Sequence, residues 1–422
     1  MNEKMSSKEN SKAIDNISIP NDWELINIGD LFDLKNGINA PKESYGKGVK
    51  FINVMEVIYR NYITSEIITG NITLSDKQIS DYTVKRGDVL FNRTSETKEE
   101  IGLAAVYLDD PIVVFGGFVI KASPKNKRII DDYKKYIFHS NFVREQIIKG
   151  GQGAIRSNIG QCDLEKVKLP IPPLFEQKTI ARILGLMDSL IISNNKIVTQ
   201  YELRKKWLMQ QLLNGSKRLK GFSEEWKENK LSDLFDRVLR KNTAGNTTVV
   251  TISAQRGFVR QTDFFNKNIA SEITDDYFLV EKGEFCYNKS YSNGYPWGAT
   301  KRLNDFDKAV VTTLYICFGV KDENATNPEF FEQYFGANLL DKGLTKIAHE
   351  GGRAHGLLNV TPSDFFSLKV SVPLYKEQTA IAQVLQAADK EIKLLKVKSE
   401  KLREQKKWIM QQLLTGKKRL SV

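Results

Sequence analysis

Two stretches of the chain carry a helical pattern of apolar residues. From Gln177 to Leu213, apolar positions recur at alternating steps of three and four with no intervening proline, which is typical of a long helix with one apolar stripe. The stripe contains, in order, Leu184, Met187, Ile191, Asn194, Val198, Tyr201, Lys205 and Leu208. The same stripe recurs 201 residues later as Leu385, Ala388, Ile392, Leu395, Ser399, Leu402, Lys406 and Ile409. The pattern predicts two long helices with matching heptads.

Each predicted helix needs a long partner. A helix of 37 residues spans roughly 55 Å, which is more than a small domain can cover, and the available partner is the other long helix. Polar residues within the stripes weaken the seam but can fix its register. Prolines at 170, 172, 173 and 373 precede the helices, and Gly215 and Gly416 follow them at C-cap-like positions. The alternative is that each helix packs on the surface of its own domain.

The helical stretches belong to a repeat of about 200 residues. The segments 206–219 and 407–420 are identical at eleven of fourteen positions, and the same offset of 201 relates Glu176-Gln177 to Glu377-Gln378. Upstream the offset is not constant. Trp23 corresponds to Trp226 at an offset of 203 residues, and Asn92-Arg93 corresponds to Asn288-Lys289 at an offset of 196. We expect a disordered polar leader at 1–20, globular domains at 21–175 and 216–375, and long helices at 176–215 and 376–422.

The regions between the helices show short β-rich runs, including 88–91, 104–107, 112–115, 248–251 and 309–312. A helical pattern appears at 131–148 and again at 328–347. Each half is therefore expected to be a mixed α/β domain. The pattern leaves the strand order open.

The composition favours one class of partner. The formal charge of +12 and a pI near 9.2 favour binding to a polyanionic partner or to an anionic surface. The three cysteines are far apart, with no Cys-x-x-Cys pair, and only three histidines are present, which argues against a disulfide framework and a structural zinc site. No apolar run resembles a signal peptide or a membrane span, so we expect a soluble, cytoplasmic protein without a bound metal.

Several loops combine small residues with cationic or amide side chains, a composition that lets a backbone approach phosphates while long donors reach bases. Because such loops recur at equivalent places in both halves, we predict that they contact DNA. Any single loop is also compatible with an ordinary solvated turn, and Asn158 and Asn359 are equally compatible with structural residues that hold the backbone. The predicted DNA-binding residues are Asn92, Arg93, Ser95, Lys98, Gln152, Arg156, Asn158, Gln255, Arg256, Asn288, Lys289, Tyr291, Arg353 and His355.

Motifs for catalysis are missing from the chain. Asn327-Pro328-Glu329-Phe330 resembles the Asn-Pro-Pro-aromatic motif of amino-methyltransferases but lacks its second proline, and we interpret it as a helix cap. No phosphate-binding Gly-x-x-x-x-Gly-Lys-[Ser/Thr] loop and no convincing nuclease constellation of carboxylates and lysine occurs. We therefore expect a chain with no catalytic residues and no cofactor of its own.

The order of these motifs carries a family resemblance. Each half ends in a Pro-x-x-x-Glu-Gln element (Pro172 to Gln177, and Pro373 to Gln378), a heptad helix, and Gln-Gln-Leu-Leu-x-Gly at 210–215 and 411–416. This arrangement resembles the specificity subunit of type I DNA restriction-modification systems, over residues 23–420. A small departure is Ser371, which stands where the first copy has Pro170.

The resemblance implies an α/β fold with two target-recognition domains, separated by two long antiparallel coiled-coil helices. Each domain would read one half of a bipartite, asymmetric site in double-stranded DNA. It also implies two modification subunits that carry S-adenosylmethionine and methylate adenine, and restriction subunits that use ATP and Mg²⁺. Two other interpretations are a coiled-coil adaptor that does not read DNA and an orphan methyltransferase, which would need the missing cofactor motifs.

Overall fold

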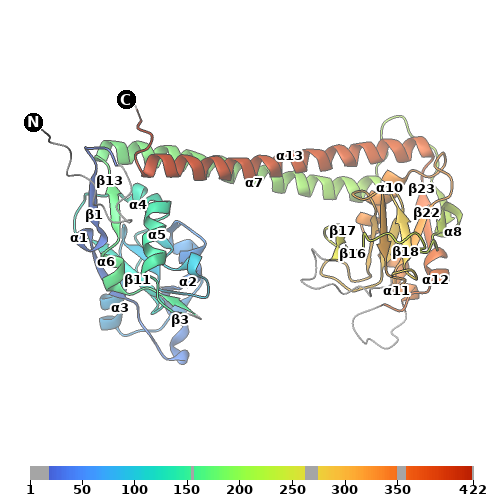
Figure 1. Cartoon of the computed structure of the whole chain (residues 1–422). Coiled ribbons are helices and arrows are strands. Elements are labelled where there is room, and N and C mark those ends of the chain that lie inside the picture. The colour runs from blue at the N-terminus through green and yellow to red at the C-terminus, as the bar shows by residue number, and fades with distance from the viewer. Residues whose placement is uncertain (1–18, 154–155, 262–273, 349–357, 421–422) are drawn as a thin grey trace, which may run out of the picture. The chain divides into compact units, whose positions relative to one another are not determined.

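The chain divides into two compact units in a computed structural model that describes residues 19–153, 156–261, 274–348 and 358–420. Unit 1 contains residues 1–194 and 398–422, and unit 2 contains residues 195–397. The predicted leader at 1–20 falls almost entirely outside the described residues. Each unit has one globular domain together with part of each of two long helices, α7 and α13 (Figure 1).

The first domain is built on a five-stranded sheet of order β2-β11-β7-β9-β4 and a four-stranded sheet of order β5-β3-β10-β6. Its strands are β1 (Glu24–Asn27), β2 (Phe32–Asn36), β3 (Tyr45–Ile52), β4 (Tyr62–Ile63), β5 (Asn71–Ile72), β6 (Thr83–Val84), β7 (Val89–Asn92), β8 (Thr94–Ser95), β9 (Ala104–Tyr107), β10 (Val113–Phe115), β11 (Val119–Pro124), β12 (Ser157–Asn158) and β13 (Lys168–Ile171). Its helices are α1 (Ile28–Leu31), α2 (Val54–Ile58), α3 (Asp76–Tyr82), α4 (Asp131–Ile137), α5 (Asn141–Gly150) and α6 (Gln161–Glu165).

The second domain has a four-stranded sheet of order β15-β22-β19-β20, with smaller sheets beside it. Its strands are β14 (Lys227–Lys230), β15 (Phe235–Arg237), β16 (Val250–Ser253), β17 (Gly257–Arg260), β18 (Phe278–Glu281), β19 (Phe285–Asn288), β20 (Ala299–Arg302), β21 (Lys308–Val311), β22 (Ile316–Val320) and β23 (Lys369–Val372). Its helices are α8 (Leu231–Leu234), α10 (Pro328–Gly336), α11 (Asp341–Ile347) and α12 (Pro362–Phe366). Both domains are thus mixed α/β, as the sequence predicted.

The central strands β7 and β9 of the first domain are buried on both faces. Every residue of β7 and β9 is buried, which explains why these strands read as continuous apolar runs rather than as alternating ones. In unit 2 the corresponding centre is aromatic: Phe235 contacts the rings of Phe285, Phe318 and Phe331. Such edge-to-face ring pairs add to the free energy gained from burying apolar area.

The two helical patterns predicted inside the domains, at 131–148 and at 328–347, are helical in the structure, and each is divided into two helices. The first stretch forms α4 and α5, because the Ser140 hydroxyl accepts from Val143 N and starts a second helix. The second stretch forms α10 and α11, with Asn338 between them at a φ of 58°, a left-handed conformation that ends a helix. The helix cap at Asn327 is confirmed, since its side chain accepts from Phe330 N and a proline occupies the first turn.

The long helices are α7 (Leu174–Leu212) and α13 (Tyr375–Leu414). Within unit 1, Asp188 contacts Lys406 and Asn194 contacts Ser399; within unit 2, Lys205 contacts Asp389 and Glu202 contacts Lys396. Residue numbers rise along one helix as they fall along the other, so the contacting segments run antiparallel in each unit. Gly215 and Gly416 have φ values of 73° and 69°, which suits glycine at a helix C-terminus.

Each domain packs against the beginning of one long helix and the end of the other. The core of the first domain includes Leu184 from α7 and Leu413 and Leu414 from the end of α13. The core of the second includes Leu385 from α13 and Leu212 from the end of α7. Burial of these side chains ties the helices to the domains. In the part of the chain that the structure describes, no helix combines the length and apolarity needed to cross a membrane.

Candidate nucleic-acid interface

The two predicted loops of the first domain meet at one junction. Strand β8 pairs with β12, which sets Ser95 opposite Ser157 and Thr94 opposite Asn158. Ile159 N donates to Arg93 O at 3.0 Å, so the segment after β7 and the segment before α6 lie side by side. Residues from two distant parts of the sequence therefore form a single surface.

The second domain has a matching junction after β19. Leu358 N donates to Lys289 O at 3.0 Å, and in the first domain the bond to Arg93 O comes from Ile159, whose counterpart at an offset of 201 is Val360, two residues further on. Asn288 Nδ2 donates to Ile252 O at 3.2 Å, which holds the turn at 253–257 against the same place. The loops at 253–257 and 288–293 therefore converge, as the loops of the first domain do.

The asparagines at the ends of β7 and β19 shape these junctions. Asn92 is 1% exposed, its Nδ2 donates to Glu100 O, and its Oδ1 accepts from Thr94 N. Asn288 Oδ1 accepts from Ser290 N in the same way. Ser95 is also buried, and its hydroxyl bonds to Glu100 Oε2. These side chains are hydrogen-bonded within the domains, so they are better placed to fix the loops than to reach a base.

Two of the predicted cations are partly buried. Arg93 Nη1 donates to Gly117 O at 3.3 Å. Lys289 Nζ donates to Val360 O at 3.4 Å, and its pKa is lowered, first by burial and then by the nearby charge of Arg237. The ends of both side chains lie at the junction, and each is anchored there by a backbone carbonyl.

The remaining predicted donors face solvent. Arg156 pairs loosely with Glu96 at 3.7 Å, and their side chains are 64% and 82% exposed. The ring of Tyr291 is 65% exposed, and the other exposed residues of the set are Lys98, Gln152, Asn158, Gln255 and Arg256. Arg353 and His355 lie outside the described residues.

Asn158 has the structural contacts that its alternative interpretation required. Its Oδ1 accepts from the Thr94 hydroxyl at 2.6 Å, and its Nδ2 donates to Arg156 O at 3.3 Å. The residue is nevertheless exposed. Asn359 in the second domain is exposed as well.

The glutamine of the repeated Glu-Gln pair holds each domain to its helix, a role that the sequence reasoning missed. Gln177 Oε1 accepts from Ile130 N, and its Nε2 donates to Arg128 O and Pro172 O. Gln378 makes the same three contacts with Asn327 N, Ala325 O and Pro373 O. The identity of the pair in both halves was the available signal, but most of its partners lie about 50 residues upstream.

The glutamate of the pair anchors the arginine that follows the other helix. Glu176 is 7% exposed and accepts from Trp23 Nε1 and from the Arg419 guanidinium. Arg419 also pairs with Asp22, and its hydrogen bond lowers the pKa of that carboxyl. In unit 2, Glu377 pairs with Arg218 at 2.6 Å.

The tryptophans differ between the two units. Trp226 corresponds to Trp23, yet its Nε1 has no hydrogen-bond partner among the described residues. The Arg218 guanidinium lies over the Trp226 ring instead, 5.8 Å from its centroid. The same motif therefore supports its domain through different contacts.

The predicted stripe residues of the long helices differ in exposure. Leu184, Val198, Leu385 and Ile392 are buried, and the other members are partly buried, namely Met187, Ile191, Tyr201, Leu208, Leu395, Leu402 and Ile409. The polar interruptions pair with one another or with acids: Asn194 Nδ2 donates to Ser399 Oγ at 2.7 Å, while Lys205 and Lys406 form the ion pairs with Asp389 and Asp188.

Metal-ligating residues do not gather within the described ranges: no three His, Cys, Asp or Glu side chains there could hold an ion. Cys286 and Cys317 lie opposite each other in β19 and β22, with their Sγ atoms 3.2 Å apart. Both thiols are buried and form no disulfide, and burial raises the pKa of Cys286.

A family model matches the chain twice. Residues 20–202 and 223–404 each match the type I restriction modification DNA specificity domain. The chain therefore belongs to this family. It is a specificity subunit with two target-recognition domains, a non-catalytic component of a type I restriction-modification system. This confirms the family and the function that the motifs indicated.

Individual relatives agree with this assignment. The chain is 27% identical over 437 residues to the Methanocaldococcus jannaschii protein assigned as the MjaX specificity subunit, with 98% of this chain and 97% of the relative covered. It is 23% identical over 440 residues to the MjaVIII specificity subunit of the same organism, with the same coverage. The Escherichia coli EcoKI specificity subunit is 23% identical over 211 residues, which cover 50% of this chain and 45% of that one.

Solved structures share the fold. The HsdS subunit from Thermoanaerobacter tengcongensis gives a TM-score of 0.52 at 14% identity, with 96% of this chain and 100% of that one covered. A chain from a structure on assembly and conformational transition of the type I system gives a TM-score of 0.59 at 14% identity, with 94% and 98% covered.

Proposed function

We propose that the two domains each read one half of a bipartite, asymmetric DNA site. The observation that carries this proposal is the junction after β7 and after β19, where in each domain the residue after the strand's asparagine accepts a backbone hydrogen bond from the segment near Asn158 or Asn359, while the surrounding side chains differ. Arg93, Lys98 and Arg156 surround the first junction, whereas Lys289, Tyr291 and Arg256 surround the second. A shared frame with different donors suits two half-sites of different sequence.

The long helices are proposed to pair as an antiparallel coiled coil that sets the distance between the half-sites, within a pseudo-repeat of about 200 residues. Support comes from the Asp188–Lys406 pair in unit 1 and the Lys205–Asp389 pair in unit 2, which join equivalent positions at an offset of 201. Two readers joined by a stiff spacer make the second binding event intramolecular, which raises affinity for a site with the right spacing.

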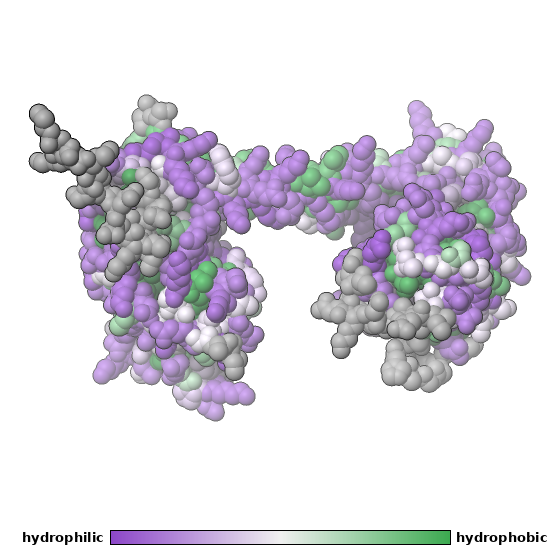
Figure 2. Space-filling view, viewed as in Figure 1, coloured by the Kyte–Doolittle hydropathy of each residue, from purple (hydrophilic) through white to green (hydrophobic). Residues whose placement is uncertain are grey.

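Two modification subunits and the restriction subunits are the proposed protein partners, with S-adenosylmethionine, ATP and Mg²⁺ bound on them. The family assignment supports these partners, and exposed apolar residues on α7 support a protein-binding face. Leu186, Leu190 and Ile192 are 56%, 53% and 52% exposed, and hydrophobic residues are visible on the surface of the helices in Figure 2. Exposed apolar groups of this kind favour a protein interface. We place this assembly in the cytoplasm, where the DNA is.

Exchange of one domain tests the proposed function. Residues 25–169 are replaced by the corresponding segment of a relative with a different site, and methylated adenines are mapped across the genome. We expect one half-site to change and the other to stay the same. The matched control replaces the second domain and should change only the other half-site. A change in both halves from a single exchange would contradict the two-reader model, and a chain that binds no preferred duplex would favour the adaptor alternative.

A further inference from the structure

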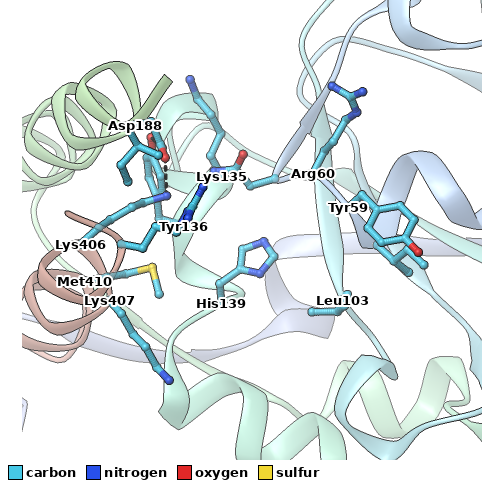
Figure 3. Close-up of a pocket in the computed structure, with 14 residues that line it drawn as sticks. Tyr59, Arg60, Leu103, Lys135, Tyr136, His139, Asp188, Lys406, Lys407 and Met410 are labelled. Carbon is cyan, nitrogen blue, oxygen red and sulfur yellow. Dashed lines mark hydrogen bonds and ion pairs between the residues drawn. The ribbon is translucent and has the colours of Figure 1, made fainter. Parts of the chain in front are cut away.

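A pocket in unit 1 lies between the first domain and the two helix segments of that unit. It has a volume of about 460 Å³ and is lined by the turn at 58–61, by α4 and the residues after it, and by α7 and α13. Figure 3 shows His139 in the centre, with Arg60 and Lys407 on opposite sides of it. None of the residues predicted to bind DNA lines this pocket.

The wall of the pocket is strongly basic. It contains one carboxylate, Asp188, which is already occupied because it accepts from the Tyr136 hydroxyl at 2.9 Å and pairs with a lysine of α13. Two of the cations have acidic partners outside the wall, since Lys135 pairs with Asp132 and Arg403 with Glu400. Among the described residues, no carboxylate lies within ion-pair distance of Arg60 or Lys407. The cations of the wall are Arg60, Lys135, Arg403, Lys406 and Lys407.

The floor of the pocket is apolar or neutral. Leu103, Ile191 and Met410 contribute to it, and Tyr59 at the edge is 72% exposed. His139 Nε2 lies 2.9 Å from the carbonyl oxygen of residue 104, and since a carbonyl only accepts, this nitrogen carries the proton.

The imidazole of His139 does not add a charge to the pocket at neutral pH. Burial, together with the charges of Arg144 and Lys406, lowers the pKa of His139 to about 4. The pocket therefore has an apolar and neutral floor beneath a cationic rim. This combination suits an apolar side chain flanked by carboxylates better than it suits a bare phosphate.

The corresponding corner of unit 2 shares the frame of this pocket. Tyr136 bonds to Asp188 in unit 1, and Gln333 bonds to Asp389 at 3.0 Å in unit 2. Because the two aspartates are equivalent at an offset of 201, these bonds align the two corners residue by residue.

The charges of the two corners differ. Glu332 stands where unit 1 has Lys135, and Glu202 stands where unit 1 has Arg403. In unit 2 these glutamates form ion pairs, Glu332 with Arg302 and Glu202 with a lysine of α13. The sign of the charge is therefore reversed at two positions of a shared frame.

We propose that the pocket of unit 1 is a docking site for an acidic segment of a modification subunit, with an apolar side chain inserted onto the floor. This inference rests on the proposed function, in which two modification subunits bind the chain. It adds that the two docking sites are unequal, because the corner of unit 2 has glutamates in place of Lys135 and Arg403, while Lys205 and Lys206 keep the charges of Lys406 and Lys407. One modification subunit is therefore held by a contact that the other does not make.

Charge reversal tests the proposal. The variants Lys407→Glu and Arg60→Glu/Lys407→Glu are compared with Lys206→Glu, the counterpart of Lys407 in unit 2. Each chain is purified with the modification subunit of its own system, and stoichiometry is measured by native mass spectrometry over a titration. We expect the double reversal to weaken binding of one modification subunit by about tenfold or more, so that complexes with one subunit accumulate, while Lys206→Glu keeps the wild-type stoichiometry. Tyr59→Ser should weaken binding of the same modification subunit without changing any charge.

DNA binding by the isolated chain separates the possible failures. If the double reversal leaves the two-subunit complex intact, the docking proposal is overturned. If it leaves that complex intact but lowers the DNA affinity of the chain alone, the pocket is a phosphate contact. If the wild-type chain itself binds no modification subunit, the proposed function fails and not only this inference. Unchanged thermal unfolding of each variant verifies that the reversals act on the surface.

Discussion

The repeated Glu-Gln pair places identical residues in different surroundings in the two units. The glutamines make matching bonds, whereas the glutamates have different sets of donors. Glu176 accepts from Trp23 and from Arg419, but the contacts of Glu377 come from Arg218 at both oxygens. Glu377 is 1% exposed. A buried carboxylate with a single cationic partner depends on that partner more strongly than one with a second donor.

Removal of each arginine should therefore have unequal effects. We predict that Arg218→Ala lowers the free energy of unfolding of unit 2 by roughly 2 to 4 kcal/mol, because it leaves a buried carboxylate unpaired. Arg419→Ala should destabilise unit 1 by less, because Trp23 still donates to Glu176. The free energy of unfolding of each variant is measured by urea denaturation, monitored by a fluorescence signal specific to each domain. Equal losses would show that Trp23 contributes nothing to the stability of the Glu176 carboxylate.

His139 makes the stability of unit 1 depend on pH. Its pKa is lowered to about 4 in the folded chain, against about 6.5 when unfolded, so the unfolded chain binds a proton first as the pH falls. The contribution to stability is therefore complete above about pH 6.5 and is lost between about pH 6.5 and 4, by up to roughly 3 kcal/mol. His139→Gln can still donate to the backbone carbonyl but does not titrate, and its unfolding should lack this component. Identical pH profiles of the free energy of unfolding for the wild-type chain and His139→Gln would contradict the lowered pKa of His139.

The cations at the two junctions should contribute to DNA affinity. We predict that Arg93→Ala, Arg156→Ala and Lys289→Ala each weaken binding, and that loss of a phosphate contact also lowers the salt slope by about one unit. Fluorescence anisotropy at several salt concentrations provides the measurement. Lys282→Ala is the control, because Lys282 pairs with Asp307 away from the junction. Unchanged affinity in all three variants would mean that other loops face the DNA.

At the scale of the elements, the helix seam in unit 1 contains a buried polar contact. Asn194 and Ser399 are 4% and 3% exposed and bond to each other in unit 1. At an offset of 201 their counterparts are Leu395 and Val198, which are apolar. The repeat therefore does not contain this polar contact a second time. A single buried polar pair can fix the register of two paired helices.

A double-mutant cycle tests this contact. We predict that Asn194→Val and Ser399→Val are each destabilising, and that the double variant recovers part of the loss, with a coupling energy of about 1 kcal/mol. Val198→Ala is a control for the loss of apolar volume on the same seam. Strictly additive effects would mean that the Asn194–Ser399 bond makes no net contribution to pairing.

The long helices could be predicted from the sequence because their stripes extend over many turns and occur twice. The junction loops could also be located, since Asn92-Arg93 and Asn288-Lys289 are matched along the chain. The burial of Asn92 and the hydrogen bond from Ile130 N to Gln177 could not be predicted, because both depend on how distant segments pack. The break at Ser140 was missed for another reason: a capping serine interrupts an apolar pattern that continues across it.

The pocket in unit 1 also escaped sequence reasoning. Its cations come from the turn at 58–61, from α4 and from α13, and no motif links these segments. The reversal of charge between Lys135 and Glu332 becomes visible only when Tyr136 and Gln333 are aligned by their bonds to equivalent aspartates. The fold was needed to place these residues together.

At the scale of the whole molecule, the central proposal is that paired helices hold two separate readers at a fixed distance. An α-helix rises 1.5 Å per residue, so four extra residues in each helix add roughly 6 Å, close to two base pairs of B-DNA. They also add about 40° of rotation, close to that of one base pair. We therefore expect a small, defined change in spacing.

The most direct measurement maps methylated adenines in a strain whose chain carries four residues inserted after Gln200 and four after Lys393. The paired insertion lengthens both helices at opposite points, so that Lys205 stays with its partner Asp389, and the Asn194–Ser399 contact is kept as well. Four residues inserted at Gly221, which has open space around it, serve as the control and should leave the spacer unchanged. We predict that both half-sites are kept and that the spacer between them grows by one or two base pairs. Full methylation at the original spacing would contradict the proposal.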